Sequence, residues 1–129
     1  MANLAVFASG NGSNFQAIAE EVKKTDHSVE FLLCNRKAAY AFERANNLGI
    51  KTYYVSYKDK TREEVEKRIL EYCTMHHISV IALAGYMKLL TPYFLELFKG
   101  EILNIHPSLL PKYSGVDGIK RSYDSGDDS

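Results

Sequence analysis

Near its beginning the chain reads Leu4-Ala-Val-Phe-Ala-Ser-Gly-Asn-Gly-Ser-Asn14, an apolar run that ends in a glycine-rich loop. The apolar residues 4–8 predict a short strand that is buried in a parallel sheet. Ser13 and Gln16 have the spacing of a capping box, which predicts that a helix begins at Ser13. A strand, a loop and a helix in this order open a βαβ unit. The buried face of the helix is predicted at Phe15, Ile18, Ala19 and Val22.

The same alternation of strand and helix continues along the rest of the chain. Apolar and β-branched runs predict further strands at residues 29–33, 50–55, 78–84 and 102–106. Helical patterns lie between them, at residues 38–47, after Thr61 and after Thr91. This order predicts an α/β fold with a doubly wound, mostly parallel sheet. The length of 129 residues suits a single domain.

Local signals mark the ends of these helices. Gly49 follows the helical pattern of residues 38–47 and is a good residue to end it. Thr61 and Glu64 form a second capping-box pattern. In Thr91-Pro92 the proline takes the first helical position, where its missing N–H costs nothing.

The composition excludes several classes of protein. Sixteen basic and sixteen acidic residues cancel, and no long basic run offers a surface for a nucleic-acid backbone. Cys34 and Cys73 are the only cysteines, and we predict two free thiols in a reducing compartment. The amino-terminal apolar run has no basic flank and is too short to cross a membrane. A cytoplasmic location without membrane contact is therefore expected.

The Ser9–Asn14 loop has the geometry of an anion site. Backbone N–H groups at a helix N-terminus are free to bind an anion, and glycines let a ligand approach closely. The loop is not a dinucleotide fingerprint, since Phe15 stands where a glycine is needed, and no Gly-Lys-Ser/Thr follows as in a P-loop. A phosphate is the expected ligand, and a tight turn that needs glycine only for its backbone is the alternative.

Asn104 and His106 form a second candidate site. Two residues apart on an extended backbone, they share one face, and Pro107 holds His106 extended. A loop follows at once, so both lie at the carboxyl edge of the predicted sheet, where open α/β sheets bind ligands. The pair fits an acid/base group beside an oxyanion donor. The alternative is a core histidine that bonds a backbone carbonyl.

Other polar residues carry less information on their own. His76-His77 lies at a helix end and is interpreted as structural. Arg62 and Lys88, taken singly, fit solvated surface cations. The segment Met87-Lys-Leu-Leu90 follows Gly85 at a strand end and could line an apolar pocket.

Three motifs together resemble the phosphoribosylglycinamide formyltransferase family. They are Ser9-Gly-Asn-Gly-Ser-Asn14, Leu83-Ala-Gly-Tyr-Met-Lys-Leu-Leu90 and Asn104-Ile-His-Pro-Ser-Leu-Leu-Pro-Lys-Tyr113, in the family's order and spacing. Formyltransferases acting on methionyl-tRNA look similar, but they usually carry glycine after the histidine and lack the first motif. The resemblance implies a Rossmann-like formyltransferase fold.

The resemblance also implies a reaction. The amine of glycinamide ribonucleotide would attack the formyl carbon of 10-formyltetrahydrofolate, and the tetrahedral intermediate would carry an oxyanion. Asn104 would donate a hydrogen bond to that oxyanion, and a protonated His106 would stabilise it and shuttle protons. The family's substrate-phosphate positions match Gly12, Ser13 and Asn14. Its folate-contacting positions match Arg62, Met87, Lys88, Leu89, Leu90 and Asn104.

The implied partners are these two small molecules, with no nucleic acid, no membrane and no metal or nucleotide cofactor. A monomer or a homodimer is expected.

The carboxyl end departs from the family pattern. The family's catalytic aspartate lies on a loop beyond Ser129, so we expect the last part of the family's domain to be missing. Ser114 stands where the family usually has proline, and Asp117 where it usually has histidine. Weak or absent turnover by this chain alone is therefore predicted. Two alternatives stay open: a non-catalytic phosphate-binding module, and another folate-dependent enzyme such as a tRNA formyltransferase or a formyl-folate hydrolase.

Overall fold

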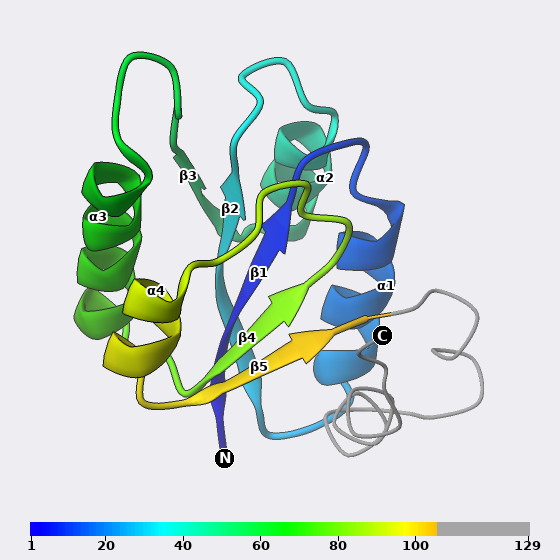
Figure 1. Ribbon diagram of the computed structural model, residues 1–129. Coiled ribbons are helices and arrows are strands. Elements are labelled where there is room, and N and C mark those ends of the chain that lie inside the picture. The colour runs from blue at the N-terminus through cyan, green and yellow to red at the C-terminus, as the bar shows by residue number, and fades with distance from the viewer. Residues whose placement is uncertain (106–129) are drawn as a thin grey trace.

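A computed structural model describes residues 1–105 of the chain, and over that range strands and helices alternate around one parallel sheet (Figure 1). The strands are β1 (Asn3–Ala8), β2 (Ser28–Cys34), β3 (Lys51–Tyr54), β4 (Val80–Leu83) and β5 (Glu101–Asn104). The helices are α1 (Ser13–Val22), α2 (Ala41–Leu48), α3 (Arg62–Met75) and α4 (Pro92–Leu97). The predicted α/β class and parallel sheet are confirmed.

The sheet has the strand order β3-β2-β1-β4-β5, and each neighbouring pair is parallel. The chain starts in the middle at β1, proceeds outward through β2 to β3, and then crosses to β4 on the other side of β1. The direction of progression thus reverses between β1 and β4. In open α/β sheets a ligand crevice forms at such a reversal, beyond the carboxyl ends of the strands.

Helices cover both faces of the sheet. Figure 1 shows α1 and α2 on one side and α3 and α4 on the other. Alternate residues of β1 serve the two layers: Leu4 and Val6 pack with α1 and α2, whereas Ala5 and Phe7 pack with α3 and α4. All four are fully buried, as expected for the middle strand of a parallel sheet.

One predicted helix cap and one predicted helix start need correction, although α1 begins at Ser13 as predicted. The capping box at Ser13 is absent: Gly12 is the N-cap of α1 with φ 82°, and the Asn11 carboxamide accepts the Ser13 N–H at 2.8 Å. Residues 38–40 precede α2, which begins only at Ala41, because the chain first turns through hydrogen bonds from Ala39 to Arg36 and from Phe42 to Ala39.

The other helix signals are confirmed. Gly49 ends α2 with φ 72°, in the left-handed conformation that glycine adopts without strain. Thr61 and Glu64 form the complete capping box of α3. Pro92 occupies the start of α4. At the far end of α3, the Nε2 atom of His76 lies 2.7 Å from the Tyr53 hydroxyl, which fits its structural interpretation.

Candidate active site at the carboxyl edge of the sheet

Of the predicted site residues within 1–105, all but Arg62 lie at or just beyond the carboxyl ends of β1, β4 and β5. The register aligns these ends, since Phe7 pairs with Leu83 and Leu83 pairs with Asn104. The Ser9–Asn14 loop leaves β1, and the loop of residues 84–91 leaves β4; Figure 1 shows both beyond the tips of their strands. The structure therefore brings the glycine loop, the Met87–Leu90 segment and Asn104 to one edge.

The glycine loop has a tightly fixed backbone. Gly12 is buried against α2, and a Cβ built on it would lie 2.7 Å from the Ala41 Cβ. The Gly10 carbonyl accepts the Ala41 N–H at 3.4 Å. Beyond this turn, the N–H groups of Asn14 and Phe15 donate to no residue within 1–105. These free donors at the start of α1 suit an anion, and the anion site itself stays a prediction.

Arg44 on α2 holds this loop through hydrogen bonds. The sequence patterns did not single this residue out. Its Nε donates to the Asn11 carbonyl at 2.7 Å, and its guanidinium also donates to the Gln16 carboxamide at 2.5 Å. Its guanidinium carbon lies 5.1 Å from the centre of the Tyr40 ring. Arg44 thus fixes the loop and adds a positive charge close to the free N–H groups.

The loop after β4 is anchored by Tyr86. The Tyr86 ring packs edge-on against Phe7 at 5.4 Å, and its hydroxyl lies 2.6 Å from the Tyr57 hydroxyl. Burial is the main cause that raises the pKa of Tyr86 far above its ordinary value, so the phenol stays protonated. On either side of Lys88, Met87 and Leu89 are 76% and 82% exposed. Two exposed apolar side chains on an anchored loop suit contact with an apolar ligand.

Arg62 and Lys88 meet over one aromatic ring. The Arg62 guanidinium carbon lies 5.5 Å from the centre of the Tyr57 ring, and the Lys88 ammonium lies 5.0 Å from it. Arg62 also donates to the Leu89 carbonyl at 2.8 Å. The structure therefore unites Arg62, the first residue of α3, with the Met87–Leu90 segment, although each cation taken singly fits a solvated surface residue.

Asn104 ends β5, and its side chain is exposed. Its carboxamide makes no hydrogen bond with another residue in the range that the structure covers, so it is available to a ligand. His106 lies outside the described residues, as does Pro107. The predicted pairing of Asn104 with His106 stays a prediction.

Two buried polar residues that the sequence patterns did not single out tie this edge together. Ser9 is 1% exposed, and its hydroxyl bonds both Asn35 and the backbone of Met87. Glu66 on α3 is fully buried, and its carboxylate accepts the Thr91 N–H at 2.9 Å and the Thr91 hydroxyl. A single sequence offers no signal for either role, because each partner lies at least 25 positions away.

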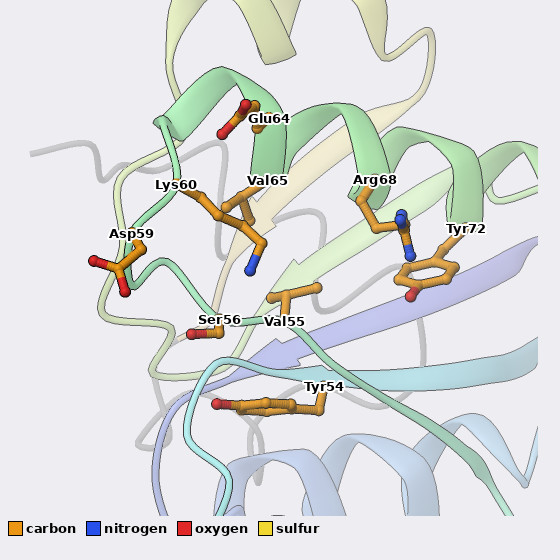
Figure 2. A pocket seen from close by; sticks show the side chains of 9 residues that line it. All are labelled: Tyr54, Val55, Ser56, Asp59, Lys60, Glu64, Val65, Arg68 and Tyr72. Atoms are coloured by element: carbon orange, nitrogen blue, oxygen red, sulfur yellow. The ribbon is translucent and has the colours of Figure 1, made fainter.

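A cavity of about 610 Å³ lies apart from this edge, between the end of β3 and α3 (Figure 2). None of the predicted site residues lines it, and its walls are Tyr54, Val55, Ser56, Asp59, Lys60, Glu64, Val65, Arg68 and Tyr72.

Residues 1–105 contain neither a membrane-spanning helix nor a metal-binding cluster of side chains. No helix there is both long and apolar enough to span a membrane. No three His, Cys, Asp or Glu side chains in that range are grouped closely enough to hold a metal ion.

Comparison with known proteins identifies the family. The family model described as Formyl transferase matches residues 2–129. The chain belongs to the formyl transferase family. Its glycine loop and its Met87–Leu90 segment are thus two loops of a formyl transferase domain.

Individual relatives carry more specific names than the family model does. Phosphoribosylglycinamide formyltransferase from Bacillus subtilis (strain 168) is 40% identical over 98% of this chain and 66% of that protein. The protein of the same name from Escherichia coli (strain K12) is 37% identical over 98% of this chain and 61% of that protein. The crystal structure of glycinamide ribonucleotide transformylase 1 from Geobacillus kaustophilus matches with a TM-score of 0.75 and 43% identity, over 98% of this chain and 69% of that chain. This formyl transferase chain thus spans 61–66% of the length of the two curated relatives.

Proposed function

We propose that this protein transfers a formyl group from 10-formyltetrahydrofolate to the amine of glycinamide ribonucleotide, a step of de novo purine biosynthesis. One observation carries the proposal: a loop with free backbone N–H groups at a helix N-terminus and a loop with exposed apolar side chains lie together at the reversal of the sheet. The names of the relatives support the choice of substrates. A phosphate ester and an aromatic folate match the two loops chemically.

The glycine loop is proposed to bind the phosphate of the ribonucleotide. Gly12, Ser13 and Asn14 begin α1, where the helix dipole favours an anion and the Asn14 N–H is free. The Arg44 guanidinium, held against the Asn11 carbonyl, adds positive charge there. Such a site recognises a phosphate without any metal ion.

The folate is proposed to bind along Arg62 and the Met87–Leu90 segment. The exposed side chains of Met87 and Leu89 supply apolar contact for an aromatic ring system. The Arg62 and Lys88 cations suit the negative charge of a folate carboxylate. Asn104 ends the neighbouring strand β5, and its carboxamide is proposed to lie near both ligands.

The transfer needs charge stabilisation and a proton shuttle. The ribonucleotide amine attacks the formyl carbon, the carbonyl oxygen becomes an oxyanion, and the Asn104 carboxamide donates a hydrogen bond to it. The C–N bond to the folate then breaks. His106 is proposed to take the proton that the amine loses and to return one to the leaving folate nitrogen. Removing one oxyanion donor typically lowers the rate about 100- to 1,000-fold, which is the loss expected for Asn104→Ala.

The test measures binding and turnover with the 129-residue chain. Calorimetric titrations use glycinamide ribonucleotide and 10-formyltetrahydrofolate separately, followed by an assay for formyl transfer. Arg62→Ala is expected to weaken folate binding about tenfold, because it removes a charge and the hydrogen bond to Leu89. Arg68→Ala is the matched control, since Arg68 also lies on α3 but lines the separate cavity in Figure 2.

The outcomes separate the alternatives. Binding of the ribonucleotide without the folate would indicate a non-catalytic phosphate-binding module. Release of free formate, or formylation of charged tRNA, would indicate another folate-dependent enzyme. Equal effects of the Arg62 and Arg68 substitutions would contradict the assigned folate site.

Three further expectations accompany this proposal. Turnover by the 129-residue chain alone is expected to be weak, and the same assay measures it. A cytoplasmic location is proposed, and the two buried free thiols, Cys34 and Cys73, suit a reducing compartment. A monomer or a homodimer is proposed, which sedimentation can decide.

A further inference from the structure

Ser9 is a buried serine at the point where the glycine loop leaves β1. Its side chain donates to the Asn35 Oδ1 atom at 2.6 Å and accepts the Met87 N–H at 2.8 Å. Asn35 follows β2, and Met87 follows β4. One hydroxyl therefore joins the loops that follow three neighbouring strands, β2, β1 and β4.

The direction of these hydrogen bonds is determined by their chemistry. The Met87 backbone N–H can only donate, so the Ser9 oxygen must accept it. The single hydroxyl proton then points to Asn35, whose carboxamide oxygen accepts it. Asn35 thus sets the rotation of the hydroxyl and turns a lone pair toward Met87. Because Ser9 is 1% exposed, water cannot readily replace either partner.

The hydrogen bond between Ser9 and Met87 also connects the two ligand loops directly. Within residues 1–105, no other hydrogen bond joins the Ser9–Asn14 loop to the loop of residues 84–91. Arg62 bonds the latter loop at Leu89, and Tyr86 anchors it through Tyr57, but both contacts come from the β3–α3 side. Within residues 1–105, Ser9 supplies the one hydrogen bond between this loop and the Ser9–Asn14 loop, while the Ala84 N–H and the Tyr86 ring contact Phe7 of β1.

We infer that Ser9 is a positioning residue that fixes the two ligand loops relative to each other, with Asn35 orienting its hydroxyl. This inference rests on the proposed function, which assigns one loop to the phosphate and the other to the folate. Ser9 touches neither ligand. It sets the distance between their sites, and a change in the glycine loop is transmitted through it to Met87.

The first test uses no ligand. Amide hydrogen exchange is measured by NMR on the 129-residue chain and on the Ser9→Ala and Ser9→Thr variants. The Met87 amide is expected to exchange at least tenfold faster in Ser9→Ala, because its acceptor is gone, and to regain protection in Ser9→Thr. The Ala84 amide, which donates to the Phe7 carbonyl at 2.8 Å, is the internal reference and keeps its rate.

A matched control and a second variant complete this test. Ser56→Ala removes the hydroxyl of a partly buried serine outside the two loops, one that accepts the Lys58 N–H at 3.2 Å, and should leave Met87 unchanged. Equal Met87 rates in the wild type and Ser9→Ala would overturn the inference. If Ser9→Ala also loses protection at the reference amide of Ala84, the same exchange measurement on Asn35→Ala decides the question. Faster exchange at Met87 with Ala84 unchanged supports the inference, and an unchanged Met87 overturns it.

The second test adds glycinamide ribonucleotide as the probe. The ligand is expected to shift the amide resonances of both Asn14 and Met87 in the wild type, and only that of Asn14 in Ser9→Ala. If the ligand shifts the amide resonance of Asn14 but not that of Met87 in the wild type, the inferred transmission through Ser9 is wrong. No response at Asn14 contradicts the proposed function instead, and the ligand-free exchange comparison still decides whether Ser9 holds the loop.

Discussion

Gly12 shows how one residue without a side chain shapes the anion site. Its φ of 82° lies in the left-handed region, and an added Cβ would come within 2.7 Å of the Ala41 Cβ and 2.8 Å of its Cα. We expect Gly12→Ala to lower the free energy of unfolding by about 2 kcal/mol or more, through backbone strain and the clash together. Urea unfolding of the variant and the wild type measures the difference.

Gly10 supplies the control for this substitution. It lies in the same loop, but a Cβ there would meet no atom within 4 Å. Gly10→Ala is therefore expected to change the unfolding free energy by less than about 0.5 kcal/mol. A similar loss in both variants would mean that the close approach of Gly12 to α2 does not limit the loop.

The sequence predicted the exposed site residues better than the residues, such as Ser9 and Arg44, whose hydrogen bonds fix the loops in place. Gly12 and the Met87–Leu90 segment stand in recognisable motifs, and the structure brings them to one edge. Ser9 and Met87 are 78 positions apart, and Arg44 lies 33 positions from Asn11. Such bonds depend on which strands become neighbours, and no local pattern of residue types contains that information.

At the level of elements, α3 has the strongest local start signal. The Thr61 hydroxyl accepts the Glu64 N–H at 3.1 Å, and the Glu64 carboxylate accepts the Thr61 N–H at 2.9 Å. Thr61→Ala is expected to destabilise the fold by about 1 kcal/mol, and Thr61→Ser, which keeps the oxygen, by much less. Thermal and urea unfolding of the two variants check this order, and equal losses would contradict it.

The start of α4 is stabilised differently, by a residue of another helix. Thr91 is its N-cap but makes no side-chain cap, and the buried Glu66 of α3 accepts the Thr91 N–H instead. Glu66→Ala leaves buried donors without a partner, so we expect a loss of about 2–3 kcal/mol in urea unfolding. Glu66→Gln keeps one acceptor oxygen and should lose less. An unchanged free energy of unfolding in Glu66→Ala would contradict the role of this contact between α3 and α4.

Element types were predictable from the sequence, but the cap of α1 and the start of α2 were not. Alternating apolar runs predicted the parallel strands because strands buried on both faces need them. The predicted start of α2 was too early, since Ala41 packs on Gly12 and bonds Gly10, which fixes where regular helix can begin. At α1 the Asn11 carboxamide accepts the Ser13 N–H, which the capping-box pattern assigns to the Gln16 side chain.

For the molecule as a whole, the buried thiols make stability depend on alkaline pH. Burial raises the pKa of Cys73 to about 12, whereas a thiol in an unfolded chain titrates near 8.5. Above pH 8.5 the unfolded chain loses this proton first, so stability falls as pH rises toward 12. Between pH 8 and pH 10 the thiol alone should lower the free energy of unfolding by about 2 kcal/mol.

The Cys73→Ala variant isolates this contribution. Cys73 is 4% exposed, and alanine fills most of its volume. Urea unfolding at pH 8 and pH 10 should show a smaller fall in the variant, by about 2 kcal/mol. Tyrosines, lysines and Cys34 titrate in both proteins, so their effects cancel in the comparison. The same fall in both proteins would mean that the Cys73 thiol ionises as readily in the folded state as in the unfolded one.

The position of β1 in the middle of the sheet also bears on how the protein folds. Leu4 pairs with Val29, which is near in sequence, and with Val80, which is far away. Closing the longer loop costs more chain entropy, so β1 and β2 should associate early and β4 should join later. The glycine loop belongs to the early unit, and Met87 lies in the loop that follows the late strand β4. During synthesis, then, the proposed phosphate loop would emerge from the ribosome before the proposed folate loop at residues 87–90, and the arrival of β4 would bring the two together.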